Sequence, residues 1–328
     1  MMRLPAFRFE MPESVEDAAA ILAEAPQSTR LVAGGTDLWP NMKRRHQGAE
    51  TVVSLAKVRA LFGVRETADG GLVIGAMTSL TDLVADPRLA DRFPGLARAI
   101  ASISSPVLRN MGTIGGNLCL DTRCTYYNQN EEWRRSIDYC MKEKGEVCWV
   151  APNSPRCWAV SSTDSAPAFL ALGASVTLVS AAGARTIPLE ELYVDDGINY
   201  LAKRRDEILT EIHVPAPGAR KTTYWKLRRR GSIDYPVLGV ACSLELEADG
   251  KTVKDVAIWL GAVRSAPVRA AEAEDLLRGQ VLGDALLDEA AKLARKPASP
   301  LDNTDYVHIW RAKMVERYVV GILRELSA

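Results

Sequence analysis

Hydrophobic residues recur at helical and at strand-like spacings in turn along the chain. In residues 12–25, Ser14 is placed to cap a helix, Asp17 follows three residues later, and alanine, isoleucine and leucine recur at helical spacing. Short apolar runs bounded by turn residues predict three strands, at 29–33, 51–56 and 71–77. The same patterns predict helices at 92–103 and 166–174, a hairpin at 175–189 that turns at 181–183, and a strand at 207–217.

Proline and glycine lie close together near residues 215–222 and indicate a linker. Beyond it, alternating residues at 237–247 and 253–263 predict two long strands joined by a hairpin turn at Asp249 and Gly250. Three helices are then predicted, at 266–279, 282–294 and 305–326. The whole pattern predicts an α+β fold without an internal repeat.

Five apolar residues recur at helical spacing in the last predicted helix: Val307, Trp310, Met314, Tyr318 and Ile322. Such a stripe is more typical of a helix face in a core than of a cofactor site.

Composition narrows the class of protein. A chain of 328 residues is long enough for two or three domains. Its 41 basic and 41 acidic residues balance, which argues against binding to nucleic acid or to a membrane surface. The first residues lack the apolar run of a signal peptide, and no stretch has the roughly 20 apolar residues of a membrane span. We therefore expect a cytoplasmic protein.

The histidines suggest no acid–base site. His46, His213 and His308 are far apart in the sequence, and each is interpreted as a surface or strand residue. We therefore predict no catalytic residues in this chain, and expect its working residues to bind cofactors.

Two turns of the chain each contain a pair of glycines next to polar residues. "AGGTD" at 33–37 and "GTIGGN" at 112–117 let consecutive backbone N–H groups face an anion without a Cβ in the way, and their polar side chains add donors. Such turns suit a pyrophosphate, although neither fits the dinucleotide fingerprint or has the lysine of a P-loop. Each turn alone is also compatible with an ordinary strand-to-helix connection.

Five of the six cysteines lie between residues 119 and 157, whereas Cys242 stands alone in an alternating segment and is predicted to be a core residue. Gaps of fifteen, seven and eight residues separate four of the five: Cys124, Cys140, Cys148 and Cys157. These gaps fit neither the close cysteine pairs of zinc modules nor the bacterial ferredoxin run. Spacing alone leaves zinc, an iron–sulfur cluster and free thiols open.

Several motifs together resemble the FAD-binding medium subunits of the xanthine oxidase class of molybdenum hydroxylases. They are "LVAGGTDLWP", "GTIGGNL", "TDSAPAFLALGA", "EILTEIHVP" and "YWKLRRRGSIDYPVLGVA", and the resemblance covers essentially the whole chain. It implies an FAD-binding domain at 1–217, with α+β subdomains at about 1–57 and 58–217, and a domain at 222–328 like the C-terminal domain of CO dehydrogenase flavoproteins.

The resemblance further implies that FAD lies extended between the two subdomains, with its pyrophosphate on the backbone of both turns. The cofactor-binding residues that it implies are Val32, Ala33, Gly34, Gly35, Thr36, Asp37, Thr113, Gly116, Asn117, Asp164, Leu209 and Lys226.

An insertion at 119–160 follows the second turn and begins "CLDTRCTYYNQNEEWRR". It resembles the insertion in the β subunits of 4-hydroxybenzoyl-CoA reductases, which carries a [4Fe–4S] cluster. The ligands that this implies are Cys124, Cys140, Cys148 and Cys157, whereas Cys119 is interpreted as a packing residue beside the flavin. Six aromatic residues of the insertion suit either a cover for the cluster or simple packing: Tyr126, Tyr127, Trp133, Tyr139, Trp149 and Trp158.

The implied function is electron transfer. In such reductases electrons from ferredoxin pass through [4Fe–4S] and FAD to a [2Fe–2S] small subunit and a molybdenum large subunit, in a dimer of heterotrimers, and 4-hydroxybenzoyl-CoA is dehydroxylated to benzoyl-CoA. The run 228–230 of arginines is interpreted as a solvated face or a cofactor or subunit contact in preference to a ferredoxin site. Two alternatives stay open: a subunit of an oxidative hydroxylase for another aromatic or heterocyclic substrate, and a zinc-stabilised binding module without redox function.

Overall fold

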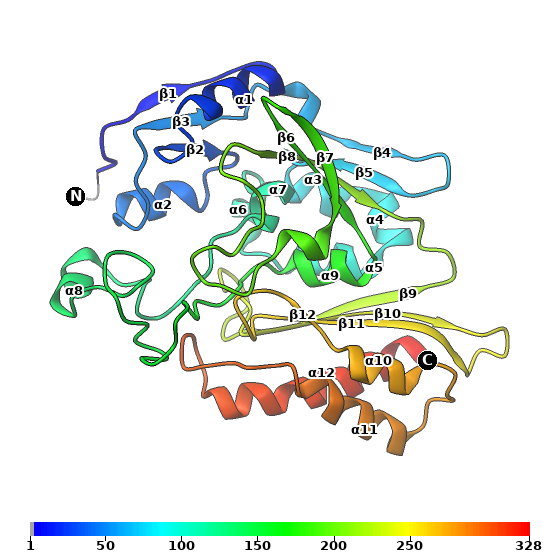
Figure 1. Ribbon diagram of the computed structural model, residues 1–328. Helices are drawn as coiled ribbons and strands as arrows, with labels where there is room; N and C mark the ends of the chain where they lie inside the picture. Colours follow the sequence, from blue (N-terminus) through cyan, green and yellow to red (C-terminus); the bar gives the residue numbers. More distant parts are fainter. Residues whose placement is uncertain (1–2) are drawn as a thin grey trace.

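The computed structural model describes residues 3–328, which form three sheets in succession along the chain (Figure 1). The first sheet is parallel, in the order β1-β3-β2. Helix α1 begins as predicted, because the hydroxyl of Ser14 accepts a hydrogen bond of 3.0 Å from the amide of Asp17. The elements are β1 Arg8–Glu10, α1 Val15–Glu24, β2 Thr29–Val32, α2 Leu38–Lys43 and β3 Thr51–Ser54.

The second sheet is antiparallel, in the order β4-β5-β8-β6-β7. Strands β4 and β5 precede the insertion in sequence, and β6, β7 and β8 follow it. Strand β8 pairs with β5 on one side and with β6 on the other, so the sheet is continuous across the insertion. The strands are β4 Val64–Glu66, β5 Leu72–Gly75, β6 Ser175–Ser180, β7 Gly183–Pro188 and β8 Ile208–Val214. The helices are η1 Arg59–Leu61, α3 Leu80–Ala85, α4 Pro87–Arg92, α5 Pro94–Ala101, α6 Pro106–Arg109, α7 Ile114–Leu118, α9 Ser165–Ala171 and η2 Leu189–Leu192.

The insertion between α7 and α9 is mostly irregular, with one short helix, α8 Glu131–Ser136, in its described residues. Figure 1 shows α8 set apart from the three sheets. Arg123 and Val160 pair through two backbone hydrogen bonds of 2.8 and 2.7 Å where the insertion leaves and rejoins the domain. The amide of Thr125 also donates to the carbonyl of Asn303 at 2.8 Å. The C-terminal domain therefore helps to hold the insertion.

The C-terminal domain is an antiparallel sheet, in the order β12-β11-β10-β9, covered on one face by three helices (Figure 1). Helix α9 packs on β10 and β11 and links this sheet to the N-terminal part of the chain. Cys242 is buried in β10, as predicted. The helix predicted at 266–279 is shorter, because Val268–Arg269 pairs with β11 as a strand. The elements are β9 Lys221–Leu227, β10 Leu238–Leu246, β11 Val253–Gly261, β12 Val268–Arg269, α10 Ala271–Leu277, α11 Asp284–Arg295 and α12 His308–Ser327.

The apolar stripe predicted on the last helix is wrong in phase in the first turns and correct at Ile322. Val307 precedes α12 and is 61% exposed, and Trp310 is 41% exposed. Ile322 is buried as predicted, and Met314 and Tyr318 pack against the core while partly buried, but the fully buried apolar residues of the preceding turns are Val315 and Val319. Even α12 is not apolar enough to cross a membrane, and neither is any other helix in residues 3–328.

A charged residue explains the phase error. Arg311 of α12 is fully buried, and its guanidinium donates to the carbonyl oxygens of Val237, Ala262 and Leu301. Burial lowers the pKa of Arg311 to about 10. A pattern of apolar residues cannot reveal a buried face that begins with an arginine satisfied by three main-chain oxygens.

Candidate functional site

A large open cavity is lined by both halves of the N-terminal region, by the insertion and by residues 233–235 of the C-terminal domain. Its volume is about 2790 Å³, including space open to solvent. Ten of the twelve residues implied by the resemblance line it: Ala33, Gly34, Gly35, Thr36, Asp37, Thr113, Gly116, Asn117, Asp164 and Leu209. Val32 does not line the cavity, since it is buried at the end of β2. Lys226 does not line it either, but it donates to two residues that do, Asp164 and Asp234.

The two glycine turns are in direct contact. A Cβ on Gly34 would lie 1.7 Å from the carbonyl oxygen of Met111, and a Cβ on Gly116 would lie 3.8 Å from the Cβ of Ala33. Gly35 has φ +70°, a conformation that favours glycine. The turns, about 80 residues apart in sequence, thus form one backbone surface on the cavity wall, which fits a pyrophosphate bound by main-chain N–H groups.

Asp37 lines the cavity, and its carboxylate also bonds to other residues of the protein. Its Oδ1 pairs with the guanidinium of Arg123, and its Oδ2 accepts from Asn41 Nδ2 at 3.0 Å. The guanidinium of Arg123 also lies 4.9 Å from the ring centroid of Tyr235. Asp37 therefore ties the first turn to Arg123 at the beginning of the insertion, and Arg123 in turn contacts Tyr235 of the C-terminal domain.

Asn117 ties the second turn to α9. Its side-chain oxygen accepts from Thr163 Oγ1 at 2.9 Å, from Ser165 Oγ at 2.6 Å and from the amide of Ser165 at 3.4 Å. Because the oxygen is used within the protein, the NH₂ group is the end of this amide left for a ligand.

Asp164 and Lys226 form a buried ion pair at the cavity wall. Lys226 Nζ donates to Asp164 Oδ2 at 3.0 Å and also to the carbonyl oxygens of Ser102 and Asp234, and Tyr224 Oη donates to Asp164 Oδ1 at 2.9 Å. Burial raises the pKa of Asp164 to about 6, against the opposing effect of Lys226. Burial also lowers the pKa of Lys226.

We expect Lys226→Met to destabilise the protein more at high pH than at low pH. Without the ammonium, the pKa of Asp164 rises further, and an acid whose folded pKa exceeds its unfolded value destabilises the fold as pH rises through that folded pKa. The loss should reach about 3 kcal/mol near pH 8 and be smaller near pH 5, where Asp164 can take up a proton. Urea denaturation at both pH values measures it, with the exposed Lys221→Met of the same strand as control. An equal loss at both pH values would contradict the assignment.

Five basic residues that the motifs did not single out also line the cavity: Arg30, Arg44, Arg123, Lys203 and Arg205. Four acidic residues also line the cavity, Asp37, Asp121, Asp164 and Asp234, so the basic residues leave only a small excess of positive charge, which favours a diphosphate. The five basic residues come from four separate segments, so no local pattern in the sequence indicates them.

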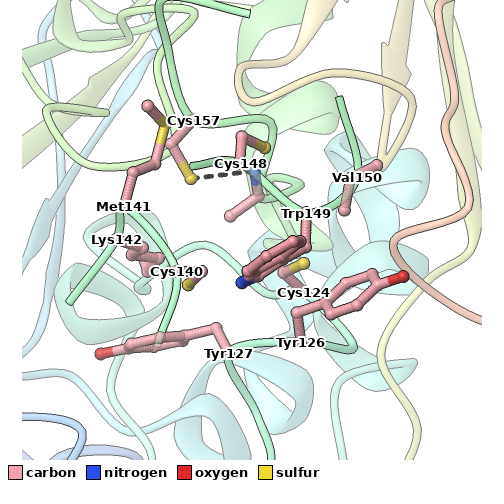
Figure 2. A pocket seen from close by; sticks show the side chains of 11 residues that line it. Cys124, Tyr126, Tyr127, Cys140, Met141, Lys142, Cys148, Trp149, Val150 and Cys157 are labelled. Carbon is pink, nitrogen blue, oxygen red and sulfur yellow. Dashed lines mark hydrogen bonds between the residues drawn. The ribbon is translucent and has the colours of Figure 1, made fainter. Parts of the chain in front are cut away.

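A second, smaller cavity lies within the insertion, and Figure 2 shows the four predicted cysteine ligands around it. Its volume is about 250 Å³, including space open to solvent. The lining residues are Cys124, Tyr126, Tyr127, Cys140, Met141, Lys142, Cys148, Trp149, Val150, Cys157 and Ala159. Four thiols spread over 34 residues of sequence thus face one largely apolar space.

Four thiols around one space are a donor set that zinc and iron–sulfur clusters use. Burial raises the pKa of Cys124 to about 11 and that of Cys157 to about 12, and it also raises the pKa of Cys140. A coordinated metal deprotonates such thiols outright. Yet no group of three or more histidine, cysteine or acidic side chains in residues 3–328 is close enough to hold a single metal ion.

Cys119 lines the large cavity and not the cavity of the four cysteines. The carbonyl oxygen of Cys119 accepts from Tyr200 Oη at 3.4 Å, and burial raises the pKa of its thiol. This position agrees with its interpretation as a residue beside the flavin.

The aromatic residues of the insertion divide into two groups. Tyr126, Tyr127 and Trp149 line the cysteine cavity, and the indole N–H of Trp149 donates to the carbonyl of Tyr139 at 2.6 Å. The other three do not line it: Trp133, Tyr139 and Trp158. The cover over the thiols is therefore made by half of the aromatic residues, and the rest pack the insertion.

The histidines remain apart. His46 is buried, in disagreement with the expectation of a surface or strand position: its ring lies 4.8 Å from that of Tyr127, and its Nε2 lies 3.0 Å from the carbonyl of Gln129. His213 lies on β8, as predicted, and His308 is on the surface at the start of α12. Burial lowers the pKa of His46.

Residues 5–217 match the family described as the FAD binding domain in molybdopterin dehydrogenase, and residues 222–326 match the CO dehydrogenase flavoprotein C-terminal domain. The chain belongs to this molybdopterin dehydrogenase flavoprotein family. It binds FAD and is an oxidoreductase subunit, which confirms the predicted family, the two-domain α+β fold and the flavin.

Individual relatives agree over nearly the full length. The chain is 29% identical over 323 residues to the carbon monoxide dehydrogenase medium chain of Hydrogenophaga pseudoflava, covering 95% of this chain and 96% of that one. It is 30% identical over 309 residues to the carbon monoxide dehydrogenase medium chain of Afipia carboxidovorans, covering 94% and 92%. A solved carbon monoxide dehydrogenase from Hydrogenophaga pseudoflava superposes with a TM-score of 0.83 at 26% identity, covering 99% and 98%.

Proposed function

We propose that this molybdopterin dehydrogenase flavoprotein is the FAD and [4Fe–4S] electron-transfer subunit of a 4-hydroxybenzoyl-CoA reductase. The proposed partners are a molybdenum large subunit and a [2Fe–2S] small subunit in a dimer of heterotrimers, with ferredoxin as electron donor. One observation carries the proposal: four cysteines face one apolar cavity directly beside the flavin cavity.

The four thiols line a common space, which suits either a zinc ion or an iron–sulfur cluster, because both can use four thiolates. The resemblance of the insertion to that of 4-hydroxybenzoyl-CoA reductase β subunits favours the cluster.

The two cavities share a wall. Arg123 lines the flavin cavity and the next residue, Cys124, lines the cysteine cavity, so adjacent residues with Cα atoms about 3.8 Å apart belong to the two sites. When bound, FAD supplies one- and two-electron chemistry, which allows exchange with a one-electron cluster. The protein's own part is to hold the two groups close together and to keep water from the thiols.

The residues and boundaries implied by the resemblance are part of this proposal. The backbone of both turns binds the FAD pyrophosphate, and the Asp164–Lys226 pair orders the wall beside the flavin. The FAD-binding domain spans 1–217, with the insertion at 119–160, and the second domain spans 222–328. The cluster ligands are Cys124, Cys140, Cys148 and Cys157.

A second candidate is the flavoprotein subunit of an oxidative hydroxylase for another aromatic or heterocyclic substrate. It is favoured by the similarity to the nicotine 6-hydroxylase medium subunit of Paenarthrobacter nicotinovorans, which is 28% identical over 323 residues, with 97% of this chain and 98% of that one covered.

Anaerobic assays of the assembled complex distinguish the two candidates. With reduced ferredoxin as donor, the proposal predicts conversion of 4-hydroxybenzoyl-CoA to benzoyl-CoA, and little oxidation of nicotine or other N-heterocycles with an artificial acceptor. Oxidation of a heterocycle without reduction of 4-hydroxybenzoyl-CoA would overturn the proposal and favour the second candidate.

A further inference from the structure

A buried ion pair stands between the two cavities. Lys142 lines the cysteine cavity and Asp121 lines the flavin cavity, and Lys142 Nζ donates to Asp121 Oδ1 at 2.8 Å. Their side chains are only 5% and 8% exposed. Among the described residues that line the cysteine cavity, Lys142 is the only one with a charged side chain.

All three N–H donors of the Lys142 ammonium are used in hydrogen bonds. Besides Asp121, Lys142 Nζ donates to Thr122 Oγ1 and to the carbonyl oxygen of Gly197, both at 2.6 Å. Gly197 in turn abuts a cysteine, since a Cβ there would lie 2.6 Å from Cys157 Sγ. The ammonium of Lys142 is thus fixed on the carbonyl of a residue that abuts the thiol of Cys157.

The carboxylate of Asp121 is equally fixed at the other end. Its second oxygen accepts from Gln47 Nε2 at 3.0 Å, and Gln47 also lines the flavin cavity. Hydrogen bonds therefore run from Lys142 through Asp121 to Gln47, with the positive end toward the thiols and the negative end toward the flavin.

A buried ion pair contributes little net stability, because desolvation offsets the attraction between the charges. Its field on a neighbouring redox group is large, because the surroundings are poorly screened. A cluster gains negative charge on reduction, so an apolar cover lowers its potential, and a nearby fixed cation raises it.

We propose that Lys142, oriented by Asp121, sets the reduction potential of the group bound by the four cysteines. Lys142 and Asp121 are positioning residues, since neither is a ligand. Lys142 offsets the effect of the apolar cover and raises the potential of the cluster. This inference rests on the proposed [4Fe–4S] cluster.

Redox titration of the cluster, followed by electron paramagnetic resonance in the assembled complex, tests the inference through two variants of opposite sign. Lys142→Met removes the cation, so the reduced-to-oxidised ratio at a fixed solution potential should fall about tenfold, which is about 59 mV for a one-electron couple. Asp121→Asn leaves the ammonium unbalanced, so the ratio should rise. Lys142→Arg keeps the charge and should shift the ratio much less than Lys142→Met.

Lys144→Met is the matched control, because it removes the same charge from a side chain that is 62% exposed and screened by water. Shifts of the same sign in Lys142→Met and Asp121→Asn, or a shift in Lys144→Met as large as in Lys142→Met, would overturn the inference. If Lys142→Met fails to assemble, Asp121→Asn decides by the sign of its shift. Wild-type complex without iron in this chain would instead refute the proposed function.

Discussion

Gly34→Ala is expected to abolish most of the FAD binding of this chain. The new Cβ would lie 1.7 Å from the carbonyl oxygen of Met111, so the first turn has to move away from the second. Overpacking of this kind costs about 1–3 kcal/mol, and the displaced backbone N–H groups no longer face the pyrophosphate together. We expect FAD affinity to fall at least about tenfold, as measured by flavin content after purification and by titration of the apoprotein.

Alanine substitutions at two other glycines should have smaller effects on FAD binding. A Cβ on Gly116 would lie 3.0 Å from Thr113 Oγ1, so Gly116→Ala should weaken FAD binding less than Gly34→Ala does. Gly48 is exposed, and a Cβ at this position would have no atom within 4 Å, so Gly48→Ala should leave FAD binding unchanged. Full flavin content in Gly34→Ala would show that contact between the turns does not form the cofactor site.

Cys124→Ala is expected to remove the cluster and to leave the flavin. A cluster that loses one of four thiolates loses a covalent anchor, and iron and acid-labile sulfide should fall at least about tenfold. FAD content should stay close to that of the wild type, because Cys124 lines only the smaller cavity. Iron, sulfide and flavin analysis of the anaerobically purified chain measures all three.

The matched control is Cys119→Ala. Cys119 lies five positions earlier and lines the flavin cavity, so its loss should leave iron and sulfide unchanged. If Cys119→Ala removes iron as completely as Cys124→Ala does, the assignment of the four ligands is wrong.

Local patterns in the sequence predicted the elements that depend on neighbouring residues. The hairpin β6–β7, the hairpin β10–β11 and the capped helix α1 formed where expected, because turn glycines and a capping serine act within a few residues. The buried face of the first turns of α12 was not predictable in this way, because the buried Arg311 is satisfied by carbonyl oxygens of three other segments.

The candidate site likewise has parts that local sequence patterns reveal and parts that they do not. The glycine turns and the cysteines could be found in the sequence because glycine and cysteine are distinctive residues. That Gly34 touches Met111 and that the four thiols face one space depends on long-range folding. The pairs Asp37–Arg123 and Asp121–Lys142 carry no local signal at all, since an ion pair between distant residues leaves no periodicity in the sequence.

The most direct test of the account is a cofactor count. The chain is purified anaerobically, its absorption spectrum is recorded, and FAD, iron, acid-labile sulfide and zinc are measured per polypeptide. The account predicts about one FAD with about four irons and four sulfides, and no zinc. Flavin without iron, or zinc in place of iron, would contradict it.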